Sequence, residues 1–95
     1  MNIILAGGIN ESKYTKISED LKSELKTKGI TINTTYINTY NGKNLSKFEK
    51  NMDLVVTLGA GNQLTTSLPV IDGMGLLYPW MGKDKVIEEI EKLNA

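Results

Sequence analysis

The stretch "NIILAGGINES" at residues 2–12 is an apolar run that breaks at two glycines and continues into a polar segment able to start a helix. A continuous apolar run bounded by glycine is typical of a strand buried on both faces of a parallel sheet, which we predict at about 1–6. A strand, a glycine turn and a helix in this order form a corner where backbone amides can hold an anion. The stretch therefore predicts an α/β fold, provided that the rest of the chain continues to alternate strands with helices.

The first helix is predicted over about 12–28, with Gly29 as its stop. Its apolar residues recur at three- and four-residue spacing along one face, while lysines and acids occupy the other face. The residues on the apolar face are Tyr14, Ile17, Leu21 and Leu25.

Three more strands and a closing helix are predicted along the rest of the chain. β-branched residues alternate with polar ones over about 30–37, which is typical of a strand at a sheet edge. A turn at Asn41-Gly42 and a short or irregular helix precede a buried strand at about 53–58. "LPVIDG" at 68–73 predicts a brief fourth strand that starts at a proline, and "KDKVIEEIEKLNA" at 83–95 predicts an amphipathic helix.

Alternating strands and helices imply right-handed crossovers and an open, mainly parallel α/β sheet, which we expect in the order 2-1-3-4 with flanking helices. At 95 residues and 40% apolar content the chain forms one domain, residues 1–95, of Rossmann-like type. In such sheets the ligand crevice lies beyond the carboxyl ends of the strands where the winding direction reverses. Here the crevice is predicted between the loops after the first and third strands.

Both of these loops carry glycines that could turn backbone amides toward an anion without any basic side chain. The alternative is that the glycines only make tight turns, and for either loop alone we favour that alternative. The candidate anion-binding residues are Gly7, Gly8, Ile9, Asn10, Glu11, Ser12 and Lys13, with Gly59, Ala60, Gly61 and Asn62 in the second loop.

The composition excludes several functions. Eleven lysines balance eleven acidic residues, so no net field attracts a nucleic acid or an anionic membrane. The chain has no arginine, cysteine or histidine, which excludes disulfides, thiolate chemistry and the usual zinc sites, and we expect no metal and no cofactor. The first apolar run is too short for a signal or a membrane span, so we expect a cytoplasmic protein without direct membrane insertion.

The segment "GMGLLYPWMG" at 73–82 is unusually apolar. It could fold back over the end of the sheet to complete a small core, which we favour because a domain of this size has few other places for its only tryptophan. It could instead form a docking patch of Leu77, Tyr78, Trp80 and Met81, with Trp80 as the anchor.

The order of elements and the run "LPVIDGMGLLYPWMGKDKVIEEI" resemble the sugar-specific IIB component of the galactitol class of the bacterial phosphotransferase system. The likeness covers nearly the whole chain. It implies a protein that takes a phosphoryl group from a IIA component on a cysteine and passes it to a sugar at a membrane-embedded IIC component. The family's loop resembles "C-G-x-G-x-x-T-S".

The residues that carry the family's chemistry are missing. Gly7 stands where the cysteine is expected, and the threonine and serine of the loop fall on Lys13 and Tyr14. A glycine cannot be the low-pKa thiolate that carries the phosphoryl group. Ser12 is better interpreted as the cap of the first helix than as a nucleophile, and Glu11 as a partner of the helix dipole than as an acceptor.

Three functional hypotheses follow. In the preferred one the protein keeps the IIB-like fold without the transfer chemistry and acts as a binding or regulatory module that docks on the IIA or IIC component. In the second it is an active phosphoryl carrier with another acceptor, so its status as an enzyme is open. In the third it is an unrelated binder of a small anion or nucleotide. The sequence names neither a sugar nor an oligomeric state.

Overall fold

The computed structural model describes residues 1–8, 10–39, 44–58 and 65–94, and these residues form a four-stranded, all-parallel open sheet flanked by helices. The order along the sheet is β2-β1-β3-β4, which confirms the predicted order. The strands are β1 (Asn2–Gly7), β2 (Asn33–Asn38), β3 (Leu54–Leu58) and β4 (Val70–Asp72). The helices are α1 (Glu11–Lys26), α2 (Met74–Leu77) and α3 (Lys83–Asn94), and the 3-10 turns are η2 (Ser46–Phe48) and η3 (Pro79–Met81).

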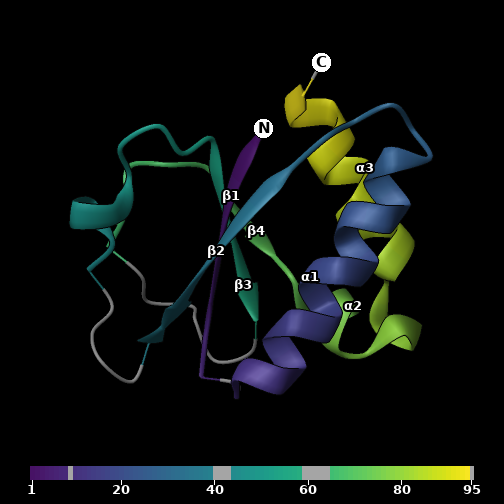
Figure 1. Cartoon of the computed structure of the whole chain (residues 1–95), viewed down its shortest axis with the longest axis horizontal. Helices are drawn as coiled ribbons and strands as arrows, with labels where there is room; N and C mark the ends of the chain where they lie inside the picture. Colours follow the sequence, from purple (N-terminus) through teal and green to yellow (C-terminus); the bar gives the residue numbers. More distant parts are fainter. Residues whose placement is uncertain (9, 40–43, 59–64, 95) are drawn as a thin grey trace.

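The three α-helices cover one face of the sheet (Figure 1). Ile3 and Leu5 of β1 point toward this face and pack in one buried cluster with residues of α1 and α3. The apolar positions predicted on α1 are the ones that face the sheet: Tyr14 is half-buried, while Ile17, Leu21 and Leu25 are buried. The helical spacing in the sequence therefore gave the correct packing face for α1.

Among the described residues, no α-helix covers the opposite face. Ile4 and Ala6 of β1 pack there with Val55 of β3 and with Leu45, which precedes η2. Right-handed crossovers explain the division, because α1 connects β1 to β2 in one direction across the sheet, whereas the chain from β2 to β3 and from β3 to β4 returns in the other direction. The returning segments must therefore cross the second face, as Figure 1 shows for the segment that contains η2.

Glu49 holds this second layer together. Its Oε2 atom accepts hydrogen bonds from Thr66 Oγ1 at 2.6 Å, Ser67 N at 2.7 Å and Ser67 Oγ at 2.9 Å. The Thr66 hydroxyl, followed by the Ser67 amide and hydroxyl, lowers the pKa of Glu49 from its ordinary value of 4.5. One carboxylate thus ties the chain after η2 to the segment that leads into β4.

Ion pairs join the two long helices on the first face. Lys83 Nζ lies 2.6 Å from Asp20 Oδ2 and 3.6 Å from Glu24 Oε1, and Lys28 Nζ lies 3.2 Å from Glu91 Oε1. The hydrogen bond to Asp20 is the main reason that the pKa of Lys83 is raised. The contacts of Lys83 fix the start of α3 against α1, and the Lys28–Glu91 pair joins the last turns of α3 to the segment that follows α1.

Some predicted boundaries differ from the structure. β2 begins at Asn33 rather than at 30, because Asn33 pairs with Asn2 at the start of β1 and earlier residues have no strand beside them. The first helix ends at Lys26, and Gly29 follows with a left-handed φ of 78°. Leu93, an apolar residue of the predicted amphipathic helix, is 45% exposed near the end of α3. The turn predicted at Asn41-Gly42 lies outside the described residues.

Replacing Leu45 by alanine tests whether the second layer is a true core. Leu45 is fully buried, so we expect Leu45→Ala to lower the free energy of unfolding by about 2–5 kcal/mol. Phe48, which is 47% exposed on η2, is the matched control, and Phe48→Ala should lower it much less. Urea unfolding followed by circular dichroism measures both, and equal losses would contradict a core on this face.

Glu49→Gln tests the carboxylate through its pH dependence. Because the pKa of Glu49 is lower in the folded than in the unfolded protein, its stabilising contribution is present above pH 4.5 and is lost as the pH falls through the folded pKa. The stability difference between wild type and Glu49→Gln should therefore be constant near neutral pH and shrink in acid. Thr66→Val removes the hydrogen bond that lowers the pKa of Glu49 most, and it should weaken this pH dependence. If stability depends on pH in both variants as it does in the wild type, Glu49 does not tie the second layer together.

Candidate functional site

β1 and β3 end side by side at the place where the sequence predicts a crevice. Gly7 is the last residue of β1 and pairs with Leu58, the last residue of β3. Residues 8–10 then connect β1 to α1, which begins at Glu11. Ile9 and the predicted second loop, Gly59, Ala60, Gly61 and Asn62, lie outside the described residues.

Gly7 is a glycine because another chain segment passes very close to it. A Cβ atom at this position would collide with the backbone oxygen of Leu58 and would lie only 2.9 Å from Leu58 Cβ. On the other side, the hydroxyl of Tyr36 donates a hydrogen bond of 3.3 Å to the Gly7 carbonyl oxygen. The glycine thus serves the close approach of β1 and β3, and any longer side chain would require the strands to move apart.

Asn10 caps α1, and this corrects the expectation for Ser12. The Oδ1 atom of Asn10 accepts a hydrogen bond of 2.8 Å from the backbone amide of Lys13, whereas Ser12 lies inside the first turn of the helix. The cap lies two residues before Ser12, and the extended backbone of Asn10, with φ −76° and ψ 163°, suits the capping position. Glu11 lies in the first turn, as expected for a partner of the helix dipole.

The helix start offers an anion few free donors. The Lys13 amide is already bonded to Asn10, and the carboxylate of Glu11 adds negative charge in the same turn. The side chain of Thr15 donates to the Glu11 carbonyl oxygen at 2.9 Å, so this hydroxyl serves the helix backbone. The backbone amides of Glu11 and Ser12, in the first turn of α1, are candidates for anion binding at this corner.

Tyr14, predicted on the apolar face of the first helix, has a packing role. Its ring lies 4.7 Å from the ring of Tyr36, measured between centroids, and its hydroxyl is 3.1 Å from Thr34 Oγ1. Ser18 Oγ also lies within hydrogen-bond distance of Thr34 Oγ1, at 2.6 Å. These contacts join α1 to β2 beneath the corner, so the side chain points toward the sheet and away from an anion at the helix start.

The apolar segment 73–82 divides into a buried part and an exposed part. Leu76 is buried and Leu77 is half-buried against the main core, so the expected core role holds for α2. Trp80 is 80% exposed and Met81 is 56% exposed, which shows that the core role expected for the tryptophan was wrong. Pro79 starts η3 and Gly82 ends it with a φ of 105°, and this tight turn carries Trp80 away from the sheet.

A small pocket of about 210 Å³ lies between the end of β4, α2 and the first half of α3. The sequence gave no sign of it, because its charged residues come from separate elements and form no motif. Its lining consists of Asp72, Met74, Gly75, Met81, Gly82, Lys85, Val86 and Glu89.

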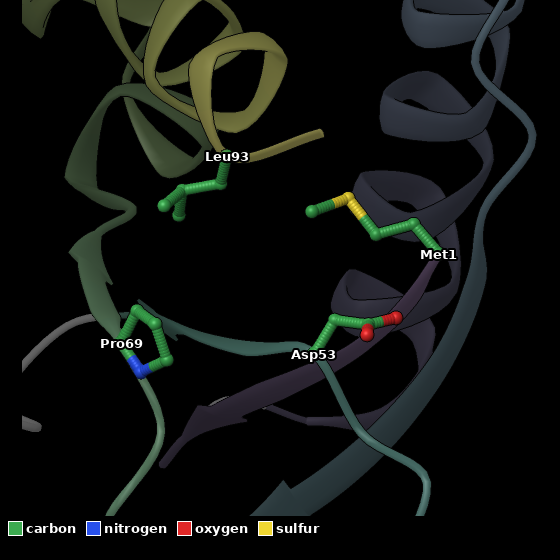
Figure 2. Close-up of a pocket in the computed structure, with 4 residues that line it drawn as sticks. All are labelled: Met1, Asp53, Pro69 and Leu93. Atoms are coloured by element: carbon green, nitrogen blue, oxygen red, sulfur yellow. The ribbon is translucent and has the colours of Figure 1, made fainter. Parts of the chain in front are cut away.

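A wider hollow of about 420 Å³ lies at the opposite, amino-terminal edge of the sheet. Figure 2 shows Met1 and Leu93 reaching into it, with Asp53 and Pro69 along its other side. Asp53 has a structural partner there, since its Oδ2 atom accepts a hydrogen bond of 2.6 Å from the Asn2 amide. The hollow lies at the edge of the sheet opposite to the predicted crevice. The Asp53 carboxylate in it holds the start of β1 against the residue that precedes β3.

Within the described ranges, no three His, Cys, Asp or Glu side chains gather as a metal site would require. In the same ranges, no helix has the length and apolar character needed to cross a membrane. Comparison with models of known protein families and with curated proteins gives no match for this chain. The fold is a small open parallel α/β sheet, and among the described residues β1 ends at a glycine that packs against the backbone of Leu58.

Phosphate binding at the helix start should be weak and should depend on Asn10. In titrations with inorganic phosphate, we expect the largest amide shifts at Glu11 and Ser12. Asn10→Ala frees the Lys13 amide and should tighten binding, even though loss of the cap lowers stability by about 1 kcal/mol. Asn10→Asp keeps the cap, adds negative charge and should weaken binding. Larger shifts at another site, or the reverse order of the variants, would contradict this interpretation.

Proposed function

We propose that this chain is a IIB-like protein of the galactitol-type sugar phosphotransferase system that has lost cysteine-based phosphoryl transfer and acts as a binding or regulatory module. The sequence resemblance supports the family, and the parallel sheet in the order β2-β1-β3-β4 is compatible with it. The role would place the protein in the cytoplasm, beside IIA and IIC components.

One observation carries the loss of transfer chemistry. Gly7 stands at the position of the phosphocysteine, and a Cβ atom there would collide with the backbone of Leu58. The close approach of the two strand ends leaves no space for a cysteine side chain at Gly7. The backbone packing around Gly7 therefore disfavours a cysteine there, so we do not expect the substitution Gly7→Cys alone to restore transfer.

The nearby residues offer a poor substitute acceptor. The Thr15 hydroxyl is bonded to the Glu11 carbonyl oxygen, and Ser12 is an exposed residue in a chain without histidine to act as its base. The Glu11 carboxylate lies exposed in the first turn, without an arginine anywhere in the chain to hold a phosphoryl group beside it. A covalent carrier would need a fixed, activated acceptor, so docking without transfer is the function that these residues support.

Incubation with phosphoenolpyruvate, the general phosphotransferase proteins and a galactitol-class IIA should leave the wild-type mass unchanged. Gly7→Cys should also fail to form phosphocysteine, because the new side chain meets the Leu58 backbone. We expect this overpacking to lower the free energy of unfolding by about 1–3 kcal/mol. Intact-mass spectrometry reads the phosphoryl transfer, and urea unfolding reads the stability.

Gly8→Cys is the matched control, because Gly8 is exposed and lies one residue beyond the strand. It should fold, react with a thiol reagent and remain unphosphorylated. Stoichiometric phosphorylation of Gly7→Cys would show that only the nucleophile was lost and would contradict the remodelled edge. Phosphorylation of the wild type would reveal an active carrier with another acceptor.

A further inference from the structure

Exposed aromatic and sulfur side chains gather on one turn of the molecule. Tyr78, Trp80 and Met81 are 36%, 80% and 56% exposed, and the rings of Tyr78 and Trp80 lie 5.3 Å apart between centroids. Among the described residues, the other exposed large apolar side chains, Phe48, Val70 and Leu93, each lie on a different element. Tryptophan, tyrosine and methionine are enriched at protein interfaces, so this cluster has the composition of a contact surface.

The 210 Å³ pocket adjoins this cluster, because Met81 belongs to both. Pockets that hold drug-sized molecules measure about 300–1,000 Å³, so this one is small for a cofactor or a nucleotide. Met74 and Met81 provide its adaptable apolar walls, and Val86 is buried at its side. Its size and lining suit a single large apolar side chain.

The charges around the pocket favour a basic partner. Two carboxylates, Asp72 and Glu89, and one ammonium group, Lys85, line it, which leaves a net charge of −1. Asp72 Oδ1 accepts a hydrogen bond of 3.0 Å from the Met74 amide. Within the described part of the chain, neither Glu89 nor Lys85 has an ion-pair partner. An incoming cation would therefore meet carboxylate oxygens that no other cation neutralises fully.

The backbone beneath the pocket is held firmly in place. A Cβ atom at Gly75 would lie 2.6 Å from the carbonyl carbon and oxygen of Gly82 and 2.7 Å from Lys83 N, so α2 and the start of α3 are in close contact. Lys83 is in turn paired with Asp20 on α1. A partner would thus meet a surface formed in advance, which reduces the entropy lost on binding.

We propose that Tyr78, Trp80 and Met81, together with the adjoining pocket, form a docking site for a polypeptide segment of a partner protein. The segment inserts one large apolar side chain between Met74 and Met81 and places a lysine or arginine beside Asp72 and Glu89. The inference rests on the proposed function in that the protein acts by docking, and it adds the chemistry of the partner's segment.

Trp80 is the only tryptophan of the chain and reports directly on the site. The probe is a short, capped peptide with leucine and lysine at helical spacing, and the control peptide carries glutamate in place of lysine. We expect the lysine peptide to shift Trp80 emission to shorter wavelength and to move the amide resonances of α2, η3 and the first half of α3. The glutamate peptide should bind more weakly.

The double variant Asp72→Asn/Glu89→Gln should bind the lysine peptide about three- to tenfold more weakly, as expected for two exposed ion pairs. Asp72→Asn retains an acceptor for the Met74 amide, and Glu88→Gln, an exposed glutamate outside the pocket lining, is the matched control that should bind as the wild type does. Urea unfolding of each variant separates a loss of binding from a loss of fold.

Several outcomes would overturn the inference: equal binding of the two peptides, amide shifts centred on another surface, or no binding at millimolar peptide. Emission that changes with protein concentration alone would identify a second copy of the chain as the occupant and would also overturn it. A IIA or IIC component that binds the double variant as tightly as the wild type would leave the proposed function standing while refuting this site.

Discussion

The burial of β1 on both faces is the constraint on which the rest of the structure depends. Residues Ile3 to Ala6 are completely buried, and their side chains alternate between the helical layer and the layer that contains η2. A strand of this kind stabilises the protein only if both faces of the sheet are covered. The long helices cover one face, and the second layer depends on Leu45 as its apolar contact and on the Glu49 carboxylate as its polar tie.

The same central strand determines what the carboxyl edge can do. β1 is paired with β2 on one side and with β3 on the other, and at its last residue the approach to Leu58 leaves space for hydrogen only. Among the described residues of this corner, the backbone amides at the start of α1 are candidates for anion binding. Asn10 already occupies one of them, which favours a stable helix over a strong anion site.

The features that could be predicted from the sequence are those set by local periodicity. The apolar runs of β1 and β3, the packing face of α1 and the order of the sheet follow from side-chain spacing and crossover handedness. The exposure of Trp80 could not be predicted, because it depends on how α2 and η3 turn between β4 and α3. The pocket was missed for a similar reason, since Asp72 and Glu89 meet only in the folded chain. Capping by Asn10 was missed because Ser12 is an equally good capping residue by type.

The proposed docking site and Gly7 belong to the same edge of the sheet. α2 starts directly after β4, and the Gly73 amide between them donates a hydrogen bond of 2.8 Å to the Thr57 carbonyl oxygen. Thr57 precedes Leu58, whose backbone closes on Gly7. Gly7 is thus connected to the start of α2 through the backbone of Thr57, Leu58 and Gly73. Under the function that we propose, the docking surface can persist without transfer chemistry at Gly7, because none of its residues belongs to β1.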